Sequence, residues 1–373
     1  MSTTPTDPTL ARLIERVRQA RSERQTLDIR GAGTKAFYGN PPAGAALEIS
    51  PLAGISSYEP SELVVTVRAG TPLAELETAL ADKGQCLPFE PPRFARPDSG
   101  SLRGGTVGGM VAAGLAGPAR AAVGGVRDYV LGATLLNGRA ELLSFGGQVM
   151  KNVAGYDVSR LLAGSMGILG VICEVSLKVL PQPVASTTLR FERDQASAIE
   201  QLQRLAGLPL PLNASAWWEG MLVLRLCGAS AAVQSATTQL GGEVVAPALA
   251  DQFWAGLRDH TDEFFVGAGE AVSRGAHLWR LSVPAGAPPI KLAGEQLIEW
   301  GGAQRWVCSP AQALAVREAA QAVGGHATLF RGAKEGLQAF APLSAPLERI
   351  HRQLKAAFDP DGIFNPGRLM AGI

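Results

Sequence analysis

The sequence predicts an α+β protein of two or three domains, and three observations lead to this prediction. The chain has 373 residues, which is long for one unit at about 100–200 residues per domain. Its amino-terminal half mixes strand-like segments with glycine-rich stretches, whereas strand-like and helix-like segments alternate after Pro183. Apolar residues make up 46% of the chain and charged residues 18%, which is typical of folded globular proteins.

Periodicity and turn signals define the elements of the amino-terminal half. Apolar residues at helical spacing mark helices, β-branched runs mark strands, and the pair Asn137-Gly138 predicts a hairpin with a two-residue type I′ turn. In order, we expect a helix around 10–17, strands at 26–30 and 63–68, a helix from Pro72 to Gly84 capped by Thr71, a short helix over 107–115, the hairpin strands 130–136 and 139–145, and a strand over 168–180.

Two rounds of α and β elements follow Pro183. The predicted elements are strands at 187–191, 221–226, 277–283, near Trp306 and at 326–331, and helices at 195–206 (capped by Asp194), 230–240, 252–258, 291–300, 310–323 and 346–358. This alternation predicts an antiparallel sheet with helices on one face.

Charge and cysteine usage exclude several classes of protein. With Lys+Arg 34 and Asp+Glu 33 the net charge is +1, so we expect no nucleic-acid partner, because such binding depends on phosphate neutralisation. No run of about 18 apolar residues occurs and the amino terminus lacks a signal-peptide pattern, so we expect a cytoplasmic chain without direct membrane insertion. The four cysteines are far apart and form no C-x-x-C, which predicts reduced thiols and no metal or iron–sulfur site.

The glycine turn at residues 30–36 allows several interpretations. It is not a Walker A loop, because Lys35 is not followed by Ser or Thr at the required spacing. Gly31-x-Gly33-x-x-Ala36 matches the Rossmann fingerprint, but Pro41 and Pro42 interrupt the helix that this motif must open. Two interpretations of this turn stay open. It could be a nest of backbone N–H groups around an anion, or a plain turn after a strand.

A second glycine-rich segment, over residues 97–127, strengthens the ligand-binding interpretation. Bare backbone at four glycines, with hydroxyls from Ser99, Ser101 and Thr106, suits a wall around a pyrophosphate. A helix starting near Val107 would add its positive end. Packing alone does not require so many glycines in one place, so we favour a ligand site.

The motifs taken together resemble a known family. RGAGTK (30–35), PDSGSLRGGTVGGMVAAG (97–114), GGVRDYVLGATLLNG (124–138), KNVAGYDVSRLLAGSMGILGVICEVSLKVLP (151–181) and DPDGIFNPGR (359–368) follow the order of FAD-linked oxidases of the vanillyl-alcohol-oxidase/p-cresol-methylhydroxylase (PCMH) type, in the lactate and glycolate dehydrogenase branch. GGHATLFR (324–331) and the moderate length make the chain most similar to GlcE-type subunits of glycolate oxidase.

The resemblance implies a domain organisation. It places a PCMH-type FAD-binding domain of two subdomains over residues 1–183, an α+β cap domain over 184–340 and a carboxy-terminal return to the FAD domain over 341–373. FAD would lie between the two subdomains, with the cap over its isoalloxazine ring.

The resemblance also assigns cofactor-binding residues. The pyrophosphate would be flanked by Arg30, Gly31, Ala32, Gly33, Thr34, Lys35, Gly104, Gly105, Thr106, Val107, Gly108 and Gly109. The flavin side would be lined by Ala112, Ala113 and Gly114, the adenosine half by Gly164, Ser165, Gly167, Gly170 and Ile172, and the region near the ring by Asn365 and Arg368. We expect Lys151, Tyr156 and Asp157 to support this site from behind.

Histidine content separates this chain from some relatives. The only histidines are His260, His277, His326 and His351, all in the last third, so we expect non-covalent FAD. The HxGDGNxH-type metal motif of catalytic members is missing. The candidate catalytic residues are therefore His326, which packing in a strand would also explain, and Arg331, which could pair with a carboxylate or form a structural ion pair.

The resemblance implies an FAD-binding subunit of a glycolate (2-hydroxy-acid) oxidase complex. Electrons from a small 2-hydroxy acid would pass through flavin to partners, namely a second FAD-linked subunit and an iron–sulfur subunit, at the inner membrane through those partners. A self-sufficient FAD-dependent alcohol oxidase and a scaffold subunit without turnover stay open as alternatives.

Overall fold

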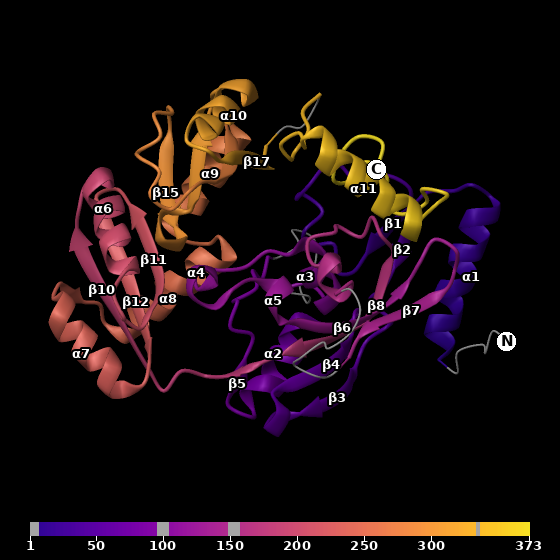
Figure 1. Cartoon of the computed structure of the whole chain (residues 1–373), viewed down its shortest axis with the longest axis horizontal. Helices are drawn as coiled ribbons and strands as arrows, with labels where there is room; N and C mark the ends of the chain where they lie inside the picture. Colours follow the sequence, from indigo (N-terminus) through magenta and orange to yellow (C-terminus); the bar gives the residue numbers. More distant parts are fainter. Residues whose placement is uncertain (1–6, 95–103, 148–156, 333–335) are drawn as a thin grey trace.

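An antiparallel five-stranded sheet organises the amino-terminal half of the chain (Figure 1). The computed structural model describes residues 7–94, 104–147, 157–332 and 336–373. The strands of this sheet lie in the order β3 (Ile55–Glu59), β4 (Val64–Arg68), β8 (Val171–Lys178), β6 (Val130–Leu136) and β7 (Leu142–Gly146). The strand β8, predicted from residue 168, begins at Val171 because Gly167 and Gly170 both have positive φ.

A smaller unit packs beside this sheet and contains both ends of the described chain. The strands β1 (Leu27–Arg30) and β2 (Ala45–Glu48) pair in parallel, and the helices α1 (Pro8–Ser22) and α11 (Ala345–Phe358) lie close to them (Figure 1). The Leu27 N–H donates to the Ile363 carbonyl at 2.7 Å, and the Asn365 N–H donates back to the Leu27 carbonyl at 2.8 Å. The carboxy-terminal turn therefore joins the edge of β1.

Short helices and strands complete the amino-terminal half. They are η1 (Pro60–Glu62), α2 (Leu73–Ala81), β5 (Gln85–Cys86), α3 (Val107–Ala113), α4 (Arg120–Val123), α5 (Val126–Tyr129), η2 (Ser159–Leu162) and β9 (Leu180–Pro181). The prediction that Thr71 caps the second helix is wrong, because the Thr71 hydroxyl donates to the Arg68 carbonyl at 2.7 Å instead.

An eight-stranded antiparallel sheet organises residues 185–331. Its order is β13 (Glu243–Val244), β10 (Ala185–Glu192), β12 (Met221–Gly228), β11 (Leu212–Trp218), β15 (Glu295–Glu299), β16 (Gln304–Ser309), β14 (His277–Ser282) and β17 (His326–Arg331). The antiparallel sheet is confirmed, and the mixture of helices and strands fits the predicted α+β class.

Helices cover both faces of this sheet, so the prediction of helices on one face is wrong. The helices α6 (Gln195–Ala206), α7 (Ser230–Leu240) and α10 (Ala313–Ala322) share apolar clusters with one face. The helices α8 (Pro247–Asp259) and α9 (Glu263–Ser273) share a cluster with the other face, which also receives side chains from the amino-terminal half. This second face is therefore the one that approaches the smaller sheets.

The helix predicted over residues 291–300 is wrong, because this segment contains the strand β15 followed by η3 (Trp300–Gly302). Leu297, Ile298 and Glu299 are consecutive and all buried. A strand in the middle of a sheet that is covered on both faces buries consecutive residues, which hides its alternation in the sequence. The strand β11 and the helix α9 were not predicted at all.

The predicted hairpin of β6 and β7 is confirmed, but its turn is not a two-residue type I′ turn. Residues 137–141 form the loop, and the positive φ falls at Ala140 rather than at Gly138. The Asn137 side-chain oxygen accepts from the Arg139 and Glu141 N–H groups, each at 2.9 Å. The Gly138 N–H donates to the Phe358 carbonyl at 2.9 Å, so contact with α11 shapes this loop.

Candidate functional site

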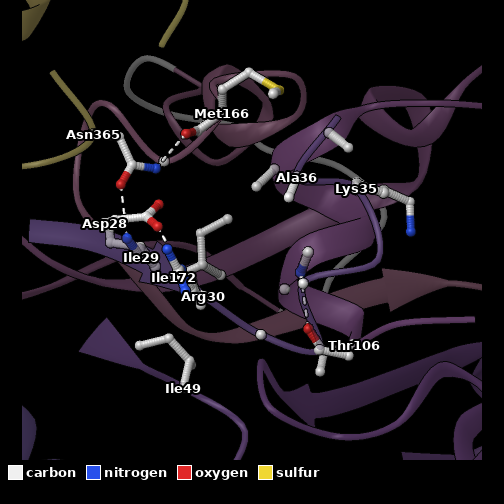
Figure 2. A pocket seen from close by; sticks show the side chains of 18 of the residues that line it. Asp28, Ile29, Arg30, Lys35, Ala36, Ile49, Thr106, Met166, Ile172 and Asn365 are labelled. Carbon is white, nitrogen blue, oxygen red and sulfur yellow. Dashed lines mark hydrogen bonds and ion pairs between the residues drawn. The ribbon is translucent and has the colours of Figure 1, made fainter. Parts of the chain in front are cut away.

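A cavity lies between the β1–β2 unit and the five-stranded sheet (Figure 2). Its walls come from the turn after β1, the end of β2, the helix α3, the segment leading into β8 and the carboxy-terminal turn. Segments from both ends and from the middle of the chain thus meet around one space.

The cavity gathers most of the predicted cofactor residues. Those lining it are Arg30, Gly31, Ala32, Gly33, Thr34, Lys35, Thr106, Gly108, Gly109, Ala112, Ala113, Gly167, Gly170, Ile172, Asn365 and Arg368. Those that do not line it are Gly104, Gly105, Val107, Gly114, Gly164, Ser165 and the two catalytic candidates His326 and Arg331. Lys151 and Tyr156, with Ser99 and Ser101, lie outside the described residues.

Sequence reasoning missed several lining residues. They are Asp28, Ile29, Ala36, Pro42, Glu48, Ile49, Ala69 and Met166. Ile49 follows directly after β2, and the parallel pairing of β2 with β1 brings it beside the glycine turn. Predicting Ile49 would therefore have required predicting this pairing. The sequence contains no signal for that pairing, since both strands are only four residues long.

The turn after β1 offers free backbone donors to the cavity. In the described part of the chain, none of the N–H groups of residues 31–35 has a hydrogen-bond acceptor. Buried or half-buried backbone donors are nearly always paired, so five consecutive free donors beside a cavity indicate a ligand that accepts hydrogen bonds. This geometry favours the anion nest over the plain strand–turn.

The first turn of α3 lines the cavity, but its backbone N–H groups donate to protein acceptors. The Val107 N–H donates to the Thr71 carbonyl at 2.9 Å, and the Gly108 N–H donates to the Ala69 carbonyl at 2.8 Å. The Gly109 N–H donates to the Thr106 side-chain oxygen at 3.2 Å. Protein groups therefore already accept from these three amides, and the placement of the positive end of this helix beside a pyrophosphate stays a prediction.

The glycines of the site serve two different purposes. A Cβ at Gly31 would lie 2.2 Å from the Thr106 hydroxyl oxygen, and one at Gly108 would lie 2.6 Å from the Ala69 Cβ. A Cβ at Gly109 would meet only the Thr106 oxygen, at 3.2 Å. Gly31 and Gly108 thus allow protein segments to approach closely, whereas Gly109 keeps the cavity wall flat.

Gly114 and Gly164 hold the end of α3 against the segment that leads to β8. Gly114 ends the helix with φ 62°, and a Cβ there would lie 2.8 Å from the Gly164 nitrogen. The Gly164 N–H donates to the Val111 carbonyl, and the Met166 N–H donates to the Ala112 carbonyl. These contacts position Met166 at the cavity.

Asn365 and Arg368 reach the cavity but direct their polar atoms at protein backbone. The Asn365 oxygen accepts from the Ile29 N–H at 2.7 Å, and its amide nitrogen donates to the Met166 carbonyl at 2.6 Å (Figure 2). Arg368 donates to the carbonyls of Asn40, Lys35 and Ala36. Both residues therefore fix the cavity walls.

A buried ion pair fixes the carboxy-terminal turn from behind. The Lys355 ammonium donates to the Asp359 carboxylate at 2.6 Å and to the carbonyls of Ile168 and Phe364. Asp359 accepts in turn from the Ile363 and Phe364 N–H groups. Both charges are buried, and each has several partners, as such a pair requires.

A group of aromatic rings and cations lies beside the cavity on the side of the eight-stranded sheet. We call it the Phe94 cluster, and it comprises Lys35, Phe37, Phe94, His260, Phe330 and Arg331. The Lys35 ammonium lies 5.8 Å and the Arg331 guanidinium 5.6 Å from the centre of the Phe94 ring. Because Lys35 also lines the cavity, the cluster and the cavity are neighbours.

The cations of the Phe94 cluster have no carboxylate within salt-bridge distance in the described part of the chain. Burial lowers the pKa of Lys35 to about 8, and Asp259 opposes this only through space. The Arg331 guanidinium stacks on Phe37 at 3.8 Å. Partly buried positive charge without a partner suits an anionic ligand.

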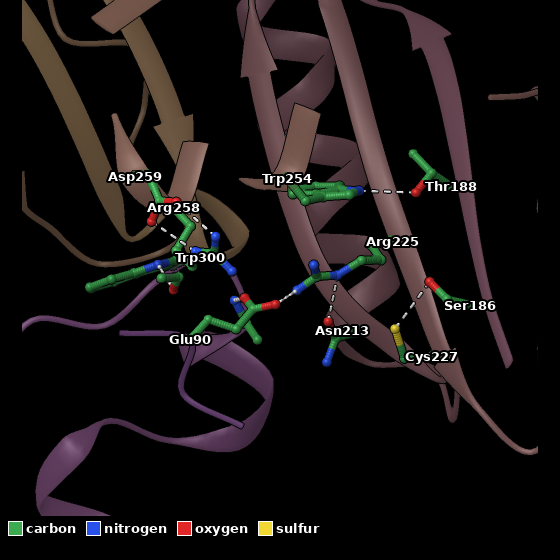
Figure 3. Close-up of polar contacts among 12 residues, drawn as sticks. Glu90, Ser186, Thr188, Asn213, Arg225, Cys227, Trp254, Arg258, Asp259 and Trp300 are labelled. Carbon is green, nitrogen blue, oxygen red and sulfur yellow. Dashed lines mark hydrogen bonds and ion pairs between the residues drawn. The ribbon is translucent and has the colours of Figure 1, made fainter. Parts of the chain in front are cut away.

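Polar contacts attach the eight-stranded sheet to the amino-terminal half (Figure 3). Arg225 of β12 donates to Glu90 at 2.7 Å, and the Trp300 indole donates to the Gly117 carbonyl at 3.0 Å. Asp259, at the end of α8, accepts from the Arg93 N–H at 3.0 Å. These contacts set the position of α8 relative to the cavity.

His326 lies away from the cavity. It is exposed at the first position of β17 and pairs with Ser282 of β14, whereas Arg331 at the other end of the strand joins the Phe94 cluster. The two catalytic candidates are thus separated by the length of β17.

Comparison with known proteins identifies the family. Residues 8–146 match the FAD binding domain family. The chain is 47% identical over 359 residues to the glycolate oxidase subunit GlcE of Escherichia coli K12, covering 96% of this chain and 97% of that protein. The chain belongs to the GlcE family of glycolate oxidase subunits.

More distant relatives match only part of this GlcE-family chain. It is 32% identical over 162 residues to the glycolate oxidase subunit GlcD of Bacillus subtilis, which covers 43% of this chain and 33% of that protein. It is 32% identical over 147 residues to a D-lactate dehydrogenase of Anaerostipes hadrus, covering 39% and 29%. The predicted resemblance is confirmed.

The fold is shared with solved structures of alkyldihydroxyacetonephosphate synthase. In one of two crystal forms the TM-score is 0.63 at 14% identity, covering 95% of this chain and 74% of that chain, and the other form gives 0.61. The predicted fold class is confirmed.

The cofactor of the GlcE-family chain is FAD, as predicted. The cavity fits this group, because a dinucleotide brings a diphosphate that can accept from the free donors of residues 31–35.

Among residues 7–94, 104–147, 157–332 and 336–373, no three His, Cys, Asp or Glu side chains gather in a way that could hold a metal ion. Across the same ranges no helix is long and apolar enough to cross a membrane.

Proposed function

We propose that this chain is the FAD-binding subunit of a glycolate (2-hydroxy-acid) oxidase complex and passes electrons from its substrate through flavin to a partner. The observation that carries the proposal is the run of free backbone donors at residues 31–35 beside a cavity walled by α3 and the carboxy-terminal turn. This arrangement suits a dinucleotide cofactor, and relatives of the chain are named as a glycolate oxidase subunit and a D-lactate dehydrogenase.

The residues that would hold FAD follow from the cavity walls. The diphosphate would accept from the N–H groups of residues 31–35, with Arg30 and Lys35 supplying positive charge. The flat wall at Gly109, Ala112 and Ala113 leaves room for ring systems. No histidine, cysteine or tyrosine is among the described residues that line the cavity, which supports non-covalent binding. When bound, FAD supplies an acceptor for two electrons.

The Phe94 cluster is the substrate side of the proposed site. Arg331 has no carboxylate partner among the described side chains and faces the cluster, so it would bind the carboxylate of a small 2-hydroxy acid. Arg280 of β14 lies next to it, over the Phe330 ring at 5.9 Å, with its guanidinium donating to the Tyr38 hydroxyl at 2.9 Å. The aromatic rings would exclude water from the bound acid.

Domains, partners and location belong to the same proposal. The FAD-binding domain would comprise residues 1–183, the cap 184–340, and the carboxy-terminal return 341–373. A second FAD-linked subunit and an iron–sulfur subunit would receive the electrons, since the free cysteines Cys86, Cys173, Cys227 and Cys308 are not grouped for a cluster. The complex would be cytoplasmic, held at the inner membrane by its partners.

Flavin analysis tests the proposal directly. The full chain is purified alone and with its co-expressed partners, and bound flavin is measured from its absorbance before and after denaturation. We expect about one FAD per chain, released on denaturation, and anaerobic bleaching by glycolate or D-lactate in the complex. A chain that is colourless and does not take up added FAD would support a scaffold subunit and contradict the proposal.

A further inference from the structure

His260 occupies an unusual position at the end of α8. It has φ 56° and ψ 47°, the left-handed conformation in which helices usually place glycine. A non-glycine residue in this conformation carries a backbone cost, and such residues concentrate at functional sites. The backbone of His260 is thus held in place by its surroundings rather than by its own preference.

Those surroundings are a nearly closed box of aromatic rings. His260 stacks on Phe265 with ring centres 3.7 Å apart and an angle of 3° between the planes. Trp306 lies at 4.9 Å, Phe94 at 5.0 Å and Phe330 at 5.3 Å. Four rings from four different parts of the chain therefore fix the imidazole plane.

The imidazole has no partner for its nitrogen atoms within the described chain. Nδ1 is buried and makes no hydrogen bond within the described chain, although leaving a buried polar atom unpaired destabilises the fold. A histidine that served packing alone would be expected to have one nitrogen satisfied. The buried, unpaired Nδ1 indicates an imidazole that is available to bond to a ligand.

The charges around His260 keep it neutral. Burial lowers its pKa well below the usual value, and the nearby guanidinium groups of Arg331 and Arg280 lower it further. Of the other charged groups near it, Asp259 is engaged by Arg258 and Arg93, and Asp262 accepts from the Phe265 N–H. Lys35 faces the same Phe94 ring and adds positive charge. A neutral imidazole can accept a proton.

We infer that His260 is the residue that accepts the hydroxyl proton of the 2-hydroxy acid whose carboxylate Arg331 binds. This inference rests on the proposed function. The O–H bond of the substrate breaks and its proton goes to an imidazole nitrogen, while the hydrogen on the same carbon leaves with its two electrons to the oxidant, FAD. The substrate becomes a 2-oxo acid, so the charges balance as imidazole becomes imidazolium.

Geometry favours His260 over His326 for this role. His260 and Arg331 both lie against the Phe94 ring, next to Lys35 at the cavity wall. His326 is exposed at the opposite end of β17 from Arg331. The imidazolium that forms would face two guanidinium groups, which promotes release of the proton after the reaction.

The test uses the full FAD-loaded chain with His260→Asn, because asparagine tolerates the left-handed conformation. Flavin content and the change in flavin absorbance on adding oxalate, an unreactive carboxylate analogue, report folding and anion binding. Anaerobic bleaching by glycolate or D-lactate in a stopped-flow instrument reports the reaction. We expect normal flavin content, oxalate binding within about threefold of wild type, and bleaching slowed at least 100-fold.

Two further variants and a pH profile complete the design. His326→Asn should bleach at the wild-type rate, and so should the matched control His351→Asn, a partly exposed residue of α11. The wild-type bleaching rate should show no loss from protonation of His260 between pH 7 and its ordinary pKa of 6.5, because burial and the two guanidinium groups lower the pKa of this imidazole well below that value. Rapid bleaching in His260→Asn, or loss in His326→Asn, would overturn the inference.

Failure of the inference and failure of the proposed function give different results. A wild-type chain that holds FAD and binds oxalate but does not bleach would refute the role of His260 while leaving the FAD-binding subunit intact. A chain that holds no FAD would refute the proposed function itself. Loss of flavin in His260→Asn alone would show a structural role and would also refute the inference.

Discussion

The cofactor cavity and the Phe94 cluster are neighbours, but they are built in opposite ways. Around the cavity the polar side chains are satisfied by protein, as with Asn365 and Arg368, and the backbone N–H groups are left free. In the cluster, the groups without a hydrogen-bond or ion-pair partner among the described residues are side chains, namely the cations Lys35 and Arg331 and the imidazole of His260.

This difference matches two separate tasks, namely binding of the cofactor and reaction of the substrate. Backbone donors in a fixed turn recognise a diphosphate without needing a particular side chain, so a cofactor can be held by glycine-rich sequence. A substrate that loses a proton and two electrons needs charged and titratable side chains near the reacting atoms.

Removing the buried ammonium behind the cavity should have the largest effect. Lys355→Met leaves the Asp359 carboxylate buried without its cation and leaves the carbonyls of Ile168 and Phe364 unpaired. We expect the free energy of unfolding to fall by about 3–5 kcal/mol and FAD to be lost on dilution. Urea unfolding and flavin content measure both quantities.

Arg352→Met on the same helix is the matched control. Arg352 pairs with Glu348 at 2.6 Å, but both side chains are about half exposed. Its removal should cost no more than about 1 kcal/mol. Equal losses in the two variants would show that the turn does not depend on the buried pair.

Two adjacent glycines of α3 should respond with opposite signs. In Gly108→Ala the new Cβ overlaps Ala69, so we expect a loss of about 1–3 kcal/mol in the chain without FAD. In Gly109→Ala the Cβ enters the cavity wall, so the FAD-free chain should gain up to about 1 kcal/mol from helix propensity while FAD binds more weakly.

Thermal unfolding with and without added FAD distinguishes the two glycine variants. Gly109→Ala should show a smaller increase in Tm on adding FAD than wild type, whereas Gly108→Ala should show a lower Tm in both conditions. Unchanged FAD affinity in Gly109→Ala would mean that the ring systems do not lie along this wall.

Neutralising Lys35 should change stability about as much as Gly108→Ala does, with a distinctive pH dependence. At pH 7 its charge is buried in the folded chain, so Lys35→Met should stabilise the FAD-free protein by about 1–3 kcal/mol while weakening FAD binding. Between pH 8 and 10.5 the folded chain loses this proton before the unfolded chain does. Wild-type stability should therefore rise with pH relative to the variant over that interval.

Urea unfolding at pH 7.5 and pH 10 measures this dependence. The difference in free energy of unfolding between Lys35→Met and wild type should shrink at the higher pH. A difference that stays constant would show that Lys35 is solvated in the FAD-free chain.

A helix cap and a glycine turn were predicted correctly, because their signals lie within a few residues of the sequence. Asp7 and Asp194 cap the helices α1 and α6, with Asp194 where predicted, and the glycine turn after β1 is where the sequence placed it. The helix over 291–300 was wrong because consecutive buried residues of a central strand resemble a buried helix. The turn at Asn137-Gly138 was wrong because its docking on α11 outweighs the local preference of these two residues.

The same division applies to the site. The glycine spacing alone predicted a dinucleotide site on the backbone of the amino-terminal half, because the effect of glycine on the backbone is local. Tertiary packing determines which backbone donors are free, because the first amides of α3 donate to the carbonyls of Thr71 and Ala69. It also decided that His260 rather than His326 joins Lys35 and Arg331, because long-range packing of α8 and β17 against Phe94 sets those distances.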